Sequence, residues 1–195
     1  KETGFLDKVS RVEAVEIEAP EAQKVSGRYK DTPKVKVINQ DFFEFYKETL
    51  GTKTYDLILG NPPYIRYQYL KESQRECQAQ ILTSHGMKSN KLINAWVAFM
   101  VASVQMLSKR GKIAFVIPAE ILQVAYAEDL RLYLANHLAK ITLITFEQLV
   151  FPDIEQEVVV FVGEKGDAEK GIRIIEMNDL SGFDALDLDR KSTRL

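Results

Sequence analysis

The sequence has few of the residues from which disulfides, metal sites and membrane spans are built. Cys77 is the only cysteine in the 195 residues, which excludes an internal disulfide and a cysteine-based metal site. The two histidines, His85 and His137, lack the short spacing of metal ligands. No apolar run approaches the length of a transmembrane helix, and the polar first residues do not resemble a signal peptide. We expect a cytoplasmic protein with neither a metal ion nor a membrane contact.

An excess of charge of one sign is also absent. The formal net charge is −2, whereas a free-standing DNA-binding domain is usually basic because phosphate contacts supply much of its affinity. This weighs against a strong grip on DNA by the chain itself, unless another part of a longer protein provides that grip. Apolar residues at 46% and charged residues at 28% are typical of an ordinary globular protein with a buried core.

Short apolar runs alternate with stretches of helical periodicity. Such alternation predicts a parallel α/β sheet with right-handed crossovers, whose ligands bind at the carboxyl ends of the strands. The predicted strands cover residues 12–17, 34–38, 55–59, 112–118, 140–146 and 157–162, with a further candidate at 172–175. One helix is predicted to begin near Pro20, and three more are predicted at residues 42–50, 92–107 and 127–138. In the helix at 92–107, Trp96 and Met100 are expected to lie in the core.

A polar stretch without a clear pattern separates residue 64 from the helix predicted at 92–107. It contains basic residues and fewer acidic ones: Arg66, Lys71, Arg75, Lys88 and Lys91 against Glu72 and Glu76. A run of this kind is usually a solvated face. A modestly basic segment next to a functional site could also touch phosphates or close over a substrate.

A stiff corner ends the strand predicted at 55–59. Gly60 is followed by Asn61, Pro62, Pro63 and Tyr64, and neither proline has an N–H with which to continue a sheet. The Asn61 side-chain oxygen and the Pro62 carbonyl could accept both hydrogens of a planar amino group, while Tyr64 stacks on the ring that carries it. The alternative is a proline-terminated strand in which Tyr64 is a packing residue. The tyrosine and the preceding apolar strand favour a binding corner.

The run Asn61-Pro62-Pro63-Tyr64 resembles motif IV of amino-methyltransferases that use S-adenosylmethionine. With the following Ile65-Arg66-Tyr67-Gln68 it is most similar to the large, gamma-type N6-adenine DNA methyltransferases of restriction–modification systems. The resemblance implies a Rossmann-like methyltransferase fold with a mostly parallel sheet and a final antiparallel strand. It also implies that Asn61, Pro62, Pro63 and Tyr64 are catalytic and that S-adenosylmethionine is the cofactor.

Three further positions match the family's motifs. Glu16 resembles the acidic residue of motif II, which bonds the ribose hydroxyls of the cofactor. Asp41 and Phe42 resemble motif III. In that motif the acid accepts a hydrogen bond from the amino group of the cofactor's adenine, and the aromatic residue packs against the adenine ring. The alternatives are a surface glutamate at 16 and a helix N-cap at Asp41, and the latter is compatible with a cofactor role. Phe151 resembles the motif VIII residue that stacks on a flipped base opposite Tyr64.

The resemblance also suggests how the chain is organised. Residues 1–165 correspond to a catalytic domain from after motif I to motif VIII, and residues 166–195 to an extension towards a target-recognition domain. The glycine-rich motif I has no counterpart, so the sheet is expected to be incomplete at its N-terminus and the chain alone to be inactive. Expected partners are double-stranded DNA, mainly through regions absent from this chain, and a fused or partner endonuclease.

Two other functions are compatible with the corner. Glutamine methyltransferases that act on release factors share the tetrapeptide and also bind a planar amino group. They carry a Glu-Pro and a Gly-Asp-Gly segment after it, which this sequence lacks. The third possibility is a methyltransferase-like scaffold that has lost cofactor binding and catalysis.

Overall fold

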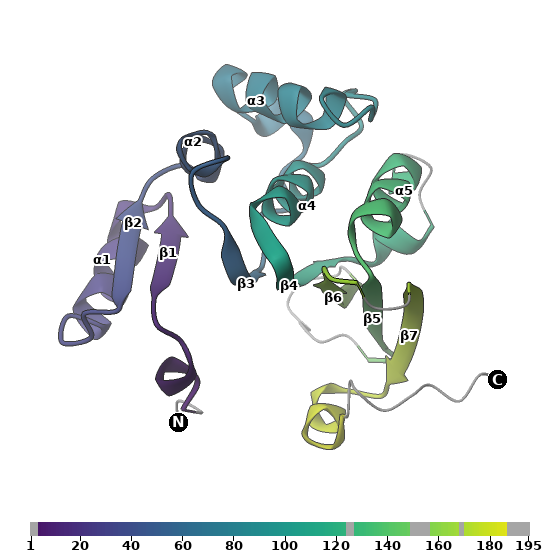
Figure 1. Ribbon diagram of the computed structural model, residues 1–195. Helices are drawn as coiled ribbons and strands as arrows, with labels where there is room; N and C mark the ends of the chain where they lie inside the picture. Colours follow the sequence, from purple (N-terminus) through teal and green to yellow (C-terminus); the bar gives the residue numbers. More distant parts are fainter. Residues whose placement is uncertain (1–3, 124–126, 149–156, 168–169, 187–195) are drawn as a thin grey trace. The chain divides into compact units, whose positions relative to one another are not determined.

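The computed structural model describes residues 4–123, 127–148, 157–167 and 170–186 (Figure 1). The chain divides into two compact units, Lys1–Thr52 and Lys53–Leu195. None of the helices in the described ranges combines the length and apolar character that crossing a bilayer requires. The described side chains include no cluster of three or more potential metal ligands.

The first unit is a βαβα arrangement around two parallel strands. Its elements are the 3-10 helix η1 (Phe5–Lys8), β1 (Val12–Glu16), α1 (Ala19–Arg28), β2 (Val35–Asn39) and α2 (Phe42–Thr49). The two strands pair in parallel from Val12 opposite Val35 to Glu16 opposite Asn39. A proline in the first turn starts α1, as the sequence predicts. Parallel pairing places the carboxyl ends of both strands at one edge.

The second unit contains a five-stranded sheet with the order β3-β4-β6-β5-β7. Its strands are β3 (Tyr55–Gly60), β4 (Leu107–Pro118), β5 (Lys140–Phe146), β6 (Val158–Glu164) and β7 (Gly171–Met177). β3 and β4 are parallel, as are β5 and β7, while β6 lies antiparallel between β4 and β5. The predicted mostly parallel α/β sheet that includes an antiparallel strand is confirmed, but the antiparallel strand is not the final one. β7 follows that strand in the chain and occupies the far edge of the sheet.

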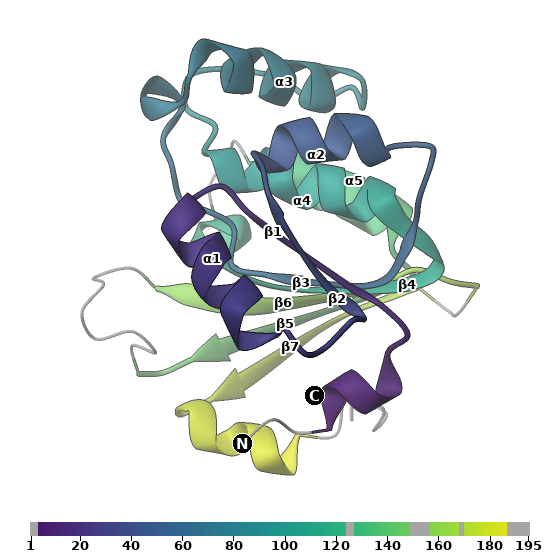
Figure 2. The same cartoon turned by 90° about the vertical axis from the view of Figure 1, so that its left-hand side faces the viewer.

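Two helices, α4 (Ala95–Met106) and α5 (Glu128–His137), cover one face of this sheet, and a third, α3 (Glu72–Thr83), packs on α4. Figure 2 shows α4 and α5 over the strands, with α3 stacked on the far side of α4. Ten of the twelve residues of α4 are buried, as required of a helix that packs against α3, α5 and β4 at once. Trp96 and Met100 are fully buried, which confirms their predicted place in the core.

The stretch between residue 64 and α4 is more ordered than its polarity predicts. It contains the 3-10 helix η2 (Tyr67–Tyr69) and the twelve-residue helix α3. The buried face of α3 includes the polar Gln78 beside Cys77, Ile81 and Leu82. A polar residue in so short a buried face hides the helical period, which is why α3 was not predicted.

The junction between α4 and β4 also differs from the prediction. We predicted a helix over 92–107 and a strand from residue 112, but α4 ends at Met106 and β4 begins directly at Leu107. The pairing with β3 shifts here, from Tyr55 opposite Leu107 to Leu57 opposite Lys112. A Cβ atom on Gly111 would lie 2.8 Å from the Tyr55 carbonyl oxygen. Glycine is therefore needed at this position for the close approach of the two backbones.

Candidate functional site

The corner after β3 leaves two hydrogen-bond acceptors available. Asn61, directly after the strand, is exposed, and Pro62 is buried. Within the described part of the chain, neither the Asn61 side chain nor the Pro62 carbonyl makes a hydrogen bond. Gly60 allows the approach to β4, because a Cβ atom there would lie 3.1 Å from Cε1 of Phe115. The prolines thus hold an amide and a carbonyl at the carboxyl end of the strand.

Tyr64 is fixed at its hydroxyl end. Its Oη donates a hydrogen bond to the carbonyl oxygen of Val116, over 3.1 Å, near the carboxyl end of β4. The side chain is part-buried, and burial raises the pKa of the Tyr64 hydroxyl to about 12. The hydroxyl therefore stays neutral, and able to donate, throughout the physiological pH range. This contact holds the ring in one orientation beside Asn61 and Pro62.

The residues after Tyr64 are tied to the start of α4. The backbone N–H of Ala95 donates to the Ile65 carbonyl over 2.9 Å, and Arg66 forms an antiparallel bridge with Asn94. These contacts satisfy one of the N–H groups that every helix N-terminus leaves without an intrahelical partner. The corner is thus anchored on both sides, to β4 through Tyr64 and to α4 through Ile65. Sequence reasoning missed Val116 and Asn94, because both act here through backbone atoms.

The predicted cofactor residues of the first unit lie at one strand edge. Glu16 ends β1, and its Oε1 accepts from the backbone N–H of Glu18 over 2.8 Å. Asn39, opposite Glu16 at the end of β2, donates through Nδ2 to the Glu16 carbonyl over 2.8 Å. Sequence reasoning missed Asn39, whose side chain ties together the turns that follow the two strands.

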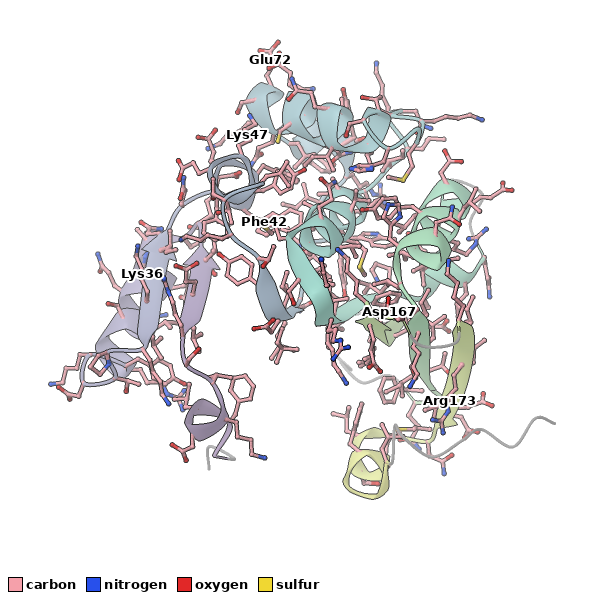
Figure 3. The ribbon with its side chains drawn as sticks, in the orientation of Figure 1. Lys36, Phe42, Lys47, Glu72, Asp167 and Arg173 are labelled. Carbon is pink, nitrogen blue, oxygen red and sulfur yellow. The ribbon has the colours of Figure 1, made fainter. Side chains whose placement is uncertain are left out.

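Asp41 is the N-cap of α2, which is the alternative that the sequence left open for this residue. Its Oδ1 accepts from the backbone N–H of Phe43 over 2.8 Å and from that of Glu44 over 3.4 Å. Phe42 is the first residue of α2 and is part-buried (Figure 3). Its ring meets that of Phe43 edge-on, with centroids 6.0 Å apart. Asp41 and Phe42 thus follow the carboxyl end of β2, the edge at which Glu16 ends β1.

The structure brings the predicted residues together as two sets. Glu16, Asp41 and Phe42 belong to the first unit, and the four residues from Asn61 to Tyr64 belong to the second. Each set follows the carboxyl ends of parallel strands, the edge at which open α/β sheets bind ligands. Phe151, the predicted base-stacking residue, lies outside the described residues.

Parallel strands with helical crossovers, an antiparallel strand (β6) between β4 and β5, and polar residues after the strands define a Rossmann-like methyltransferase fold. Solved structures share this fold. A protein of Listeria monocytogenes classed with the S-adenosylmethionine-dependent methyltransferases matches with a TM-score of 0.65 and 12% identity, over 86% of this chain and 50% of that one. The type ISP restriction–modification enzyme LlaGI, solved with a DNA substrate mimic, matches with a TM-score of 0.62 and 12% identity, over 85% of this chain and 20% of that one.

The sequence model of the Eco57I restriction-modification methylase family matches residues 8–151, and the chain belongs to this family. The type II methyltransferase M.HincII of Haemophilus influenzae is 30% identical over 154 residues, 78% of this chain. The chain spans 30% of the length of that relative. Family membership confirms the resemblance to restriction–modification methylases on which the site prediction rests.

Proposed function

We propose that the protein to which this chain belongs transfers a methyl group from S-adenosylmethionine to the N6 amino group of an adenine in DNA, within a restriction–modification or related phage-defence system. The observation that carries this proposal is the corner after β3. The Asn61 side chain and the Pro62 carbonyl make no hydrogen bond to a described residue, and the corner is held on both sides by Tyr64 and Ile65. Two acceptors on a proline-stiffened corner, next to a ring that is fixed at its hydroxyl, suit a planar aromatic amine.

The proposed role of the two acceptors follows from the chemistry of the amine. The nitrogen lone pair of an aromatic amine is delocalised into the ring, which makes the nitrogen a poor nucleophile. By accepting one hydrogen each, the Asn61 oxygen and the Pro62 carbonyl localise the lone pair and aim it at the methyl group. Positioning of this kind can supply roughly 7–11 kcal/mol at best, without a dedicated base. Pro63 keeps the corner stiff, so that the acceptors do not reorganise during transfer.

The first unit fits the cofactor at its nucleoside end. A carboxylate at the end of one strand suits a pair of ribose hydroxyls, which is the role we assign to Glu16. Asp41 and the Phe42 ring, at the end of the adjacent strand, suit an adenine amino group and its ring. Asp41 caps α2 through Oδ1, so in this proposal it stabilises the helix and binds the cofactor at once. S-adenosylmethionine, when bound, supplies the methyl group that is transferred.

The target adenine must leave the duplex to reach the corner. Extrusion of a base costs about a few kcal/mol, and stacking on aromatic side chains returns energy of similar size. The Tyr64 ring supplies one such surface, since its hydroxyl bond to Val116 leaves the ring fixed in place. We assign the opposite surface to Phe151 on the basis of its motif. The DNA duplex itself is held mainly by other parts of the full-length protein, and an endonuclease is a further expected partner or fused domain.

The test is Asn61→Ala in the full-length protein, assayed by transfer of labelled methyl groups to DNA. We expect turnover to fall by about a hundredfold or more, with S-adenosylmethionine affinity unchanged in calorimetry. The matched control is Asn136→Ala, the same chemical change at an exposed position of α5, which should leave turnover unchanged.

The same assay separates the other candidate functions. Methyl transfer to release factor and not to DNA would identify a glutamine methyltransferase. A full-length protein that does not bind S-adenosylmethionine would identify a scaffold. Retained turnover in Asn61→Ala would refute the role of the corner.

A further inference from the structure

The segment that begins after the corner carries a charge opposite to that of the rest of the chain. Residues 65–94 contain five basic and two acidic side chains, a formal charge of +3. The whole chain carries −2, so the remainder carries −5 (−2 minus +3). The two acidic residues, Glu72 and Glu76, are both on α3, and Glu72 projects outward from its first turn (Figure 3). The loop 84–94 after α3 contains Lys88 and Lys91 and no acidic residue.

Both ends of this segment lie at the proposed site. Its first residues follow Tyr64 directly, and its last residue, Asn94, forms a bridge with Arg66. The Ala95 N–H that begins α4 bonds the Ile65 carbonyl over 2.9 Å. The segment therefore leaves the corner, runs through η2 and α3, and returns to the same place. Lys91 is three residues from the returning end.

The loop 84–94 is anchored by buried apolar side chains and exposes its basic side chains to solvent. Met87 and Ile93 are buried, at 6% and 4% exposure, while Lys88 and Lys91 are exposed. The backbone N–H of Lys88 donates to Oδ2 of Asp129 on α5 over 3.1 Å. The acidic side chain of Asp129 on α5 thus contacts the backbone of this loop at Lys88. The two ammonium groups are thus displayed by an ordered loop, which lowers the entropic cost of binding an anionic partner.

Apolar groups are also exposed within residues 65–94. Tyr69 is 73% exposed in η2 and Leu92 is 78% exposed beside Lys91. The Arg75 guanidinium lies over the Tyr67 ring, 5.6 Å from its centroid. Exposed aromatic and aliphatic side chains interspersed with basic ones suit a polymer that offers both phosphates and flat bases.

We infer that residues 65–94 form a DNA-contacting rim around the corner, in which Lys88 and Lys91 neutralise backbone phosphates near the extruded adenine and Tyr69 contacts a base. This inference rests on the proposed function and deepens it, because it places a DNA contact within this chain as well as in the remainder of the protein. It also explains how a chain of negative net charge can contact DNA, since its positive charge is concentrated where DNA must approach.

The test is the salt dependence of DNA binding by the full-length protein. The double variant Lys88→Ala/Lys91→Ala is compared with wild type in titrations of a short fluorescent duplex between about 50 and 200 mM salt. Each phosphate contact contributes about 0.9 to the slope of log affinity against log salt, so the slope should become less steep by roughly 1.8. Tyr69→Ala should weaken binding several-fold with the slope unchanged, because it removes no charge.

The matched control is Lys109→Ala/Lys140→Ala. Both lysines are exposed and lie at the amino ends of β4 and β5, the sheet edge opposite the corner. This pair removes the same charge and should leave the slope unchanged. Equal slopes for wild type and the Lys88/Lys91 variant, or equal reductions in the two pairs, would overturn the inference.

Methyl transfer measured on the same preparations separates this inference from the proposed function. If the wild-type protein methylates DNA but the Lys88/Lys91 variant keeps the wild-type salt slope, the rim is refuted and the proposed function stands. Wild-type protein that neither binds nor methylates DNA refutes the rim together with the proposed function.

Discussion

The hydrogen bond from Tyr64 to β4 yields a prediction that can be worked out from the structure. Tyr64→Phe keeps the ring and removes only the hydroxyl that donates to the Val116 carbonyl over 3.1 Å. A hydrogen bond of this type contributes about 0.5–1.5 kcal/mol net to stability. We therefore expect the free energy of unfolding to fall by about 1 kcal/mol near neutral pH. Denaturant titrations of wild type and variant in parallel measure this difference.

The pH dependence of that difference is a sharper test. Burial holds the pKa of Tyr64 at about 12 in the folded protein, against 10.0 for an exposed tyrosine. The unfolded chain thus loses this proton first, and ionisation favours unfolding as pH rises. The contribution of the neutral hydroxyl is complete below about pH 10 and is lost as pH rises through about 12. Because Tyr64→Phe has no such group, the stability difference between wild type and variant should narrow over this interval.

A matched control is Tyr69→Phe, which removes a hydroxyl from a side chain that is 73% exposed. This variant should have the stability of wild type at every pH in the series. A difference between wild type and Tyr64→Phe that stays constant as pH rises, or a variant as stable as wild type, would contradict the anchoring role of the hydroxyl.

Two further predictions concern the backbone around the sheet edges. Gly111→Ala should lower the free energy of unfolding by about 1–3 kcal/mol, because its Cβ would lie 2.8 Å from the Tyr55 carbonyl oxygen and 3.0 Å from the Ser108 nitrogen. Gly171→Ala, whose Cβ would meet no atom within 4 Å, is the control in the same denaturation assay and should be neutral. Asp41→Ala should destabilise α2 by about 1 kcal/mol through loss of its cap, whereas Asp41→Asn keeps the cap. Both Asp41 variants of the full-length protein should weaken S-adenosylmethionine binding in calorimetry, and unchanged affinity in Asp41→Asn would remove Asp41 from the cofactor site.

Local signals predicted most of the elements around the site. The apolar run that stops at Asn61-Pro62-Pro63 predicts β3 and its corner, because proline cannot continue a ladder and forces the preceding residue to be extended. The position of Asp41 before an apolar helical pattern allows the cap of α2, the alternative weighed for this residue, and the structure shows that cap. These predictions succeeded because the decisive interactions lie within a few residues along the chain.

The features that were missed depend on contacts between distant residues. The insertion of β6 between β4 and β5 is a matter of long-range pairing, which the strand sequences alone do not reveal. The Val116 carbonyl and the Asn94 backbone hold the corner without any side-chain signature. The helix α3 was missed because Gln78 interrupts the apolar period of its buried face.

The identity of the methylated base tests the central claim most directly. DNA incubated with S-adenosylmethionine and the full-length protein, digested to nucleosides and analysed by mass spectrometry, should contain N6-methyladenine. The same reaction with Asn61→Ala should yield almost none, while Asn136→Ala should match wild type. A methylated cytosine in place of N6-methyladenine, or N6-methyladenine formed equally well without the Asn61 amide, would contradict the account.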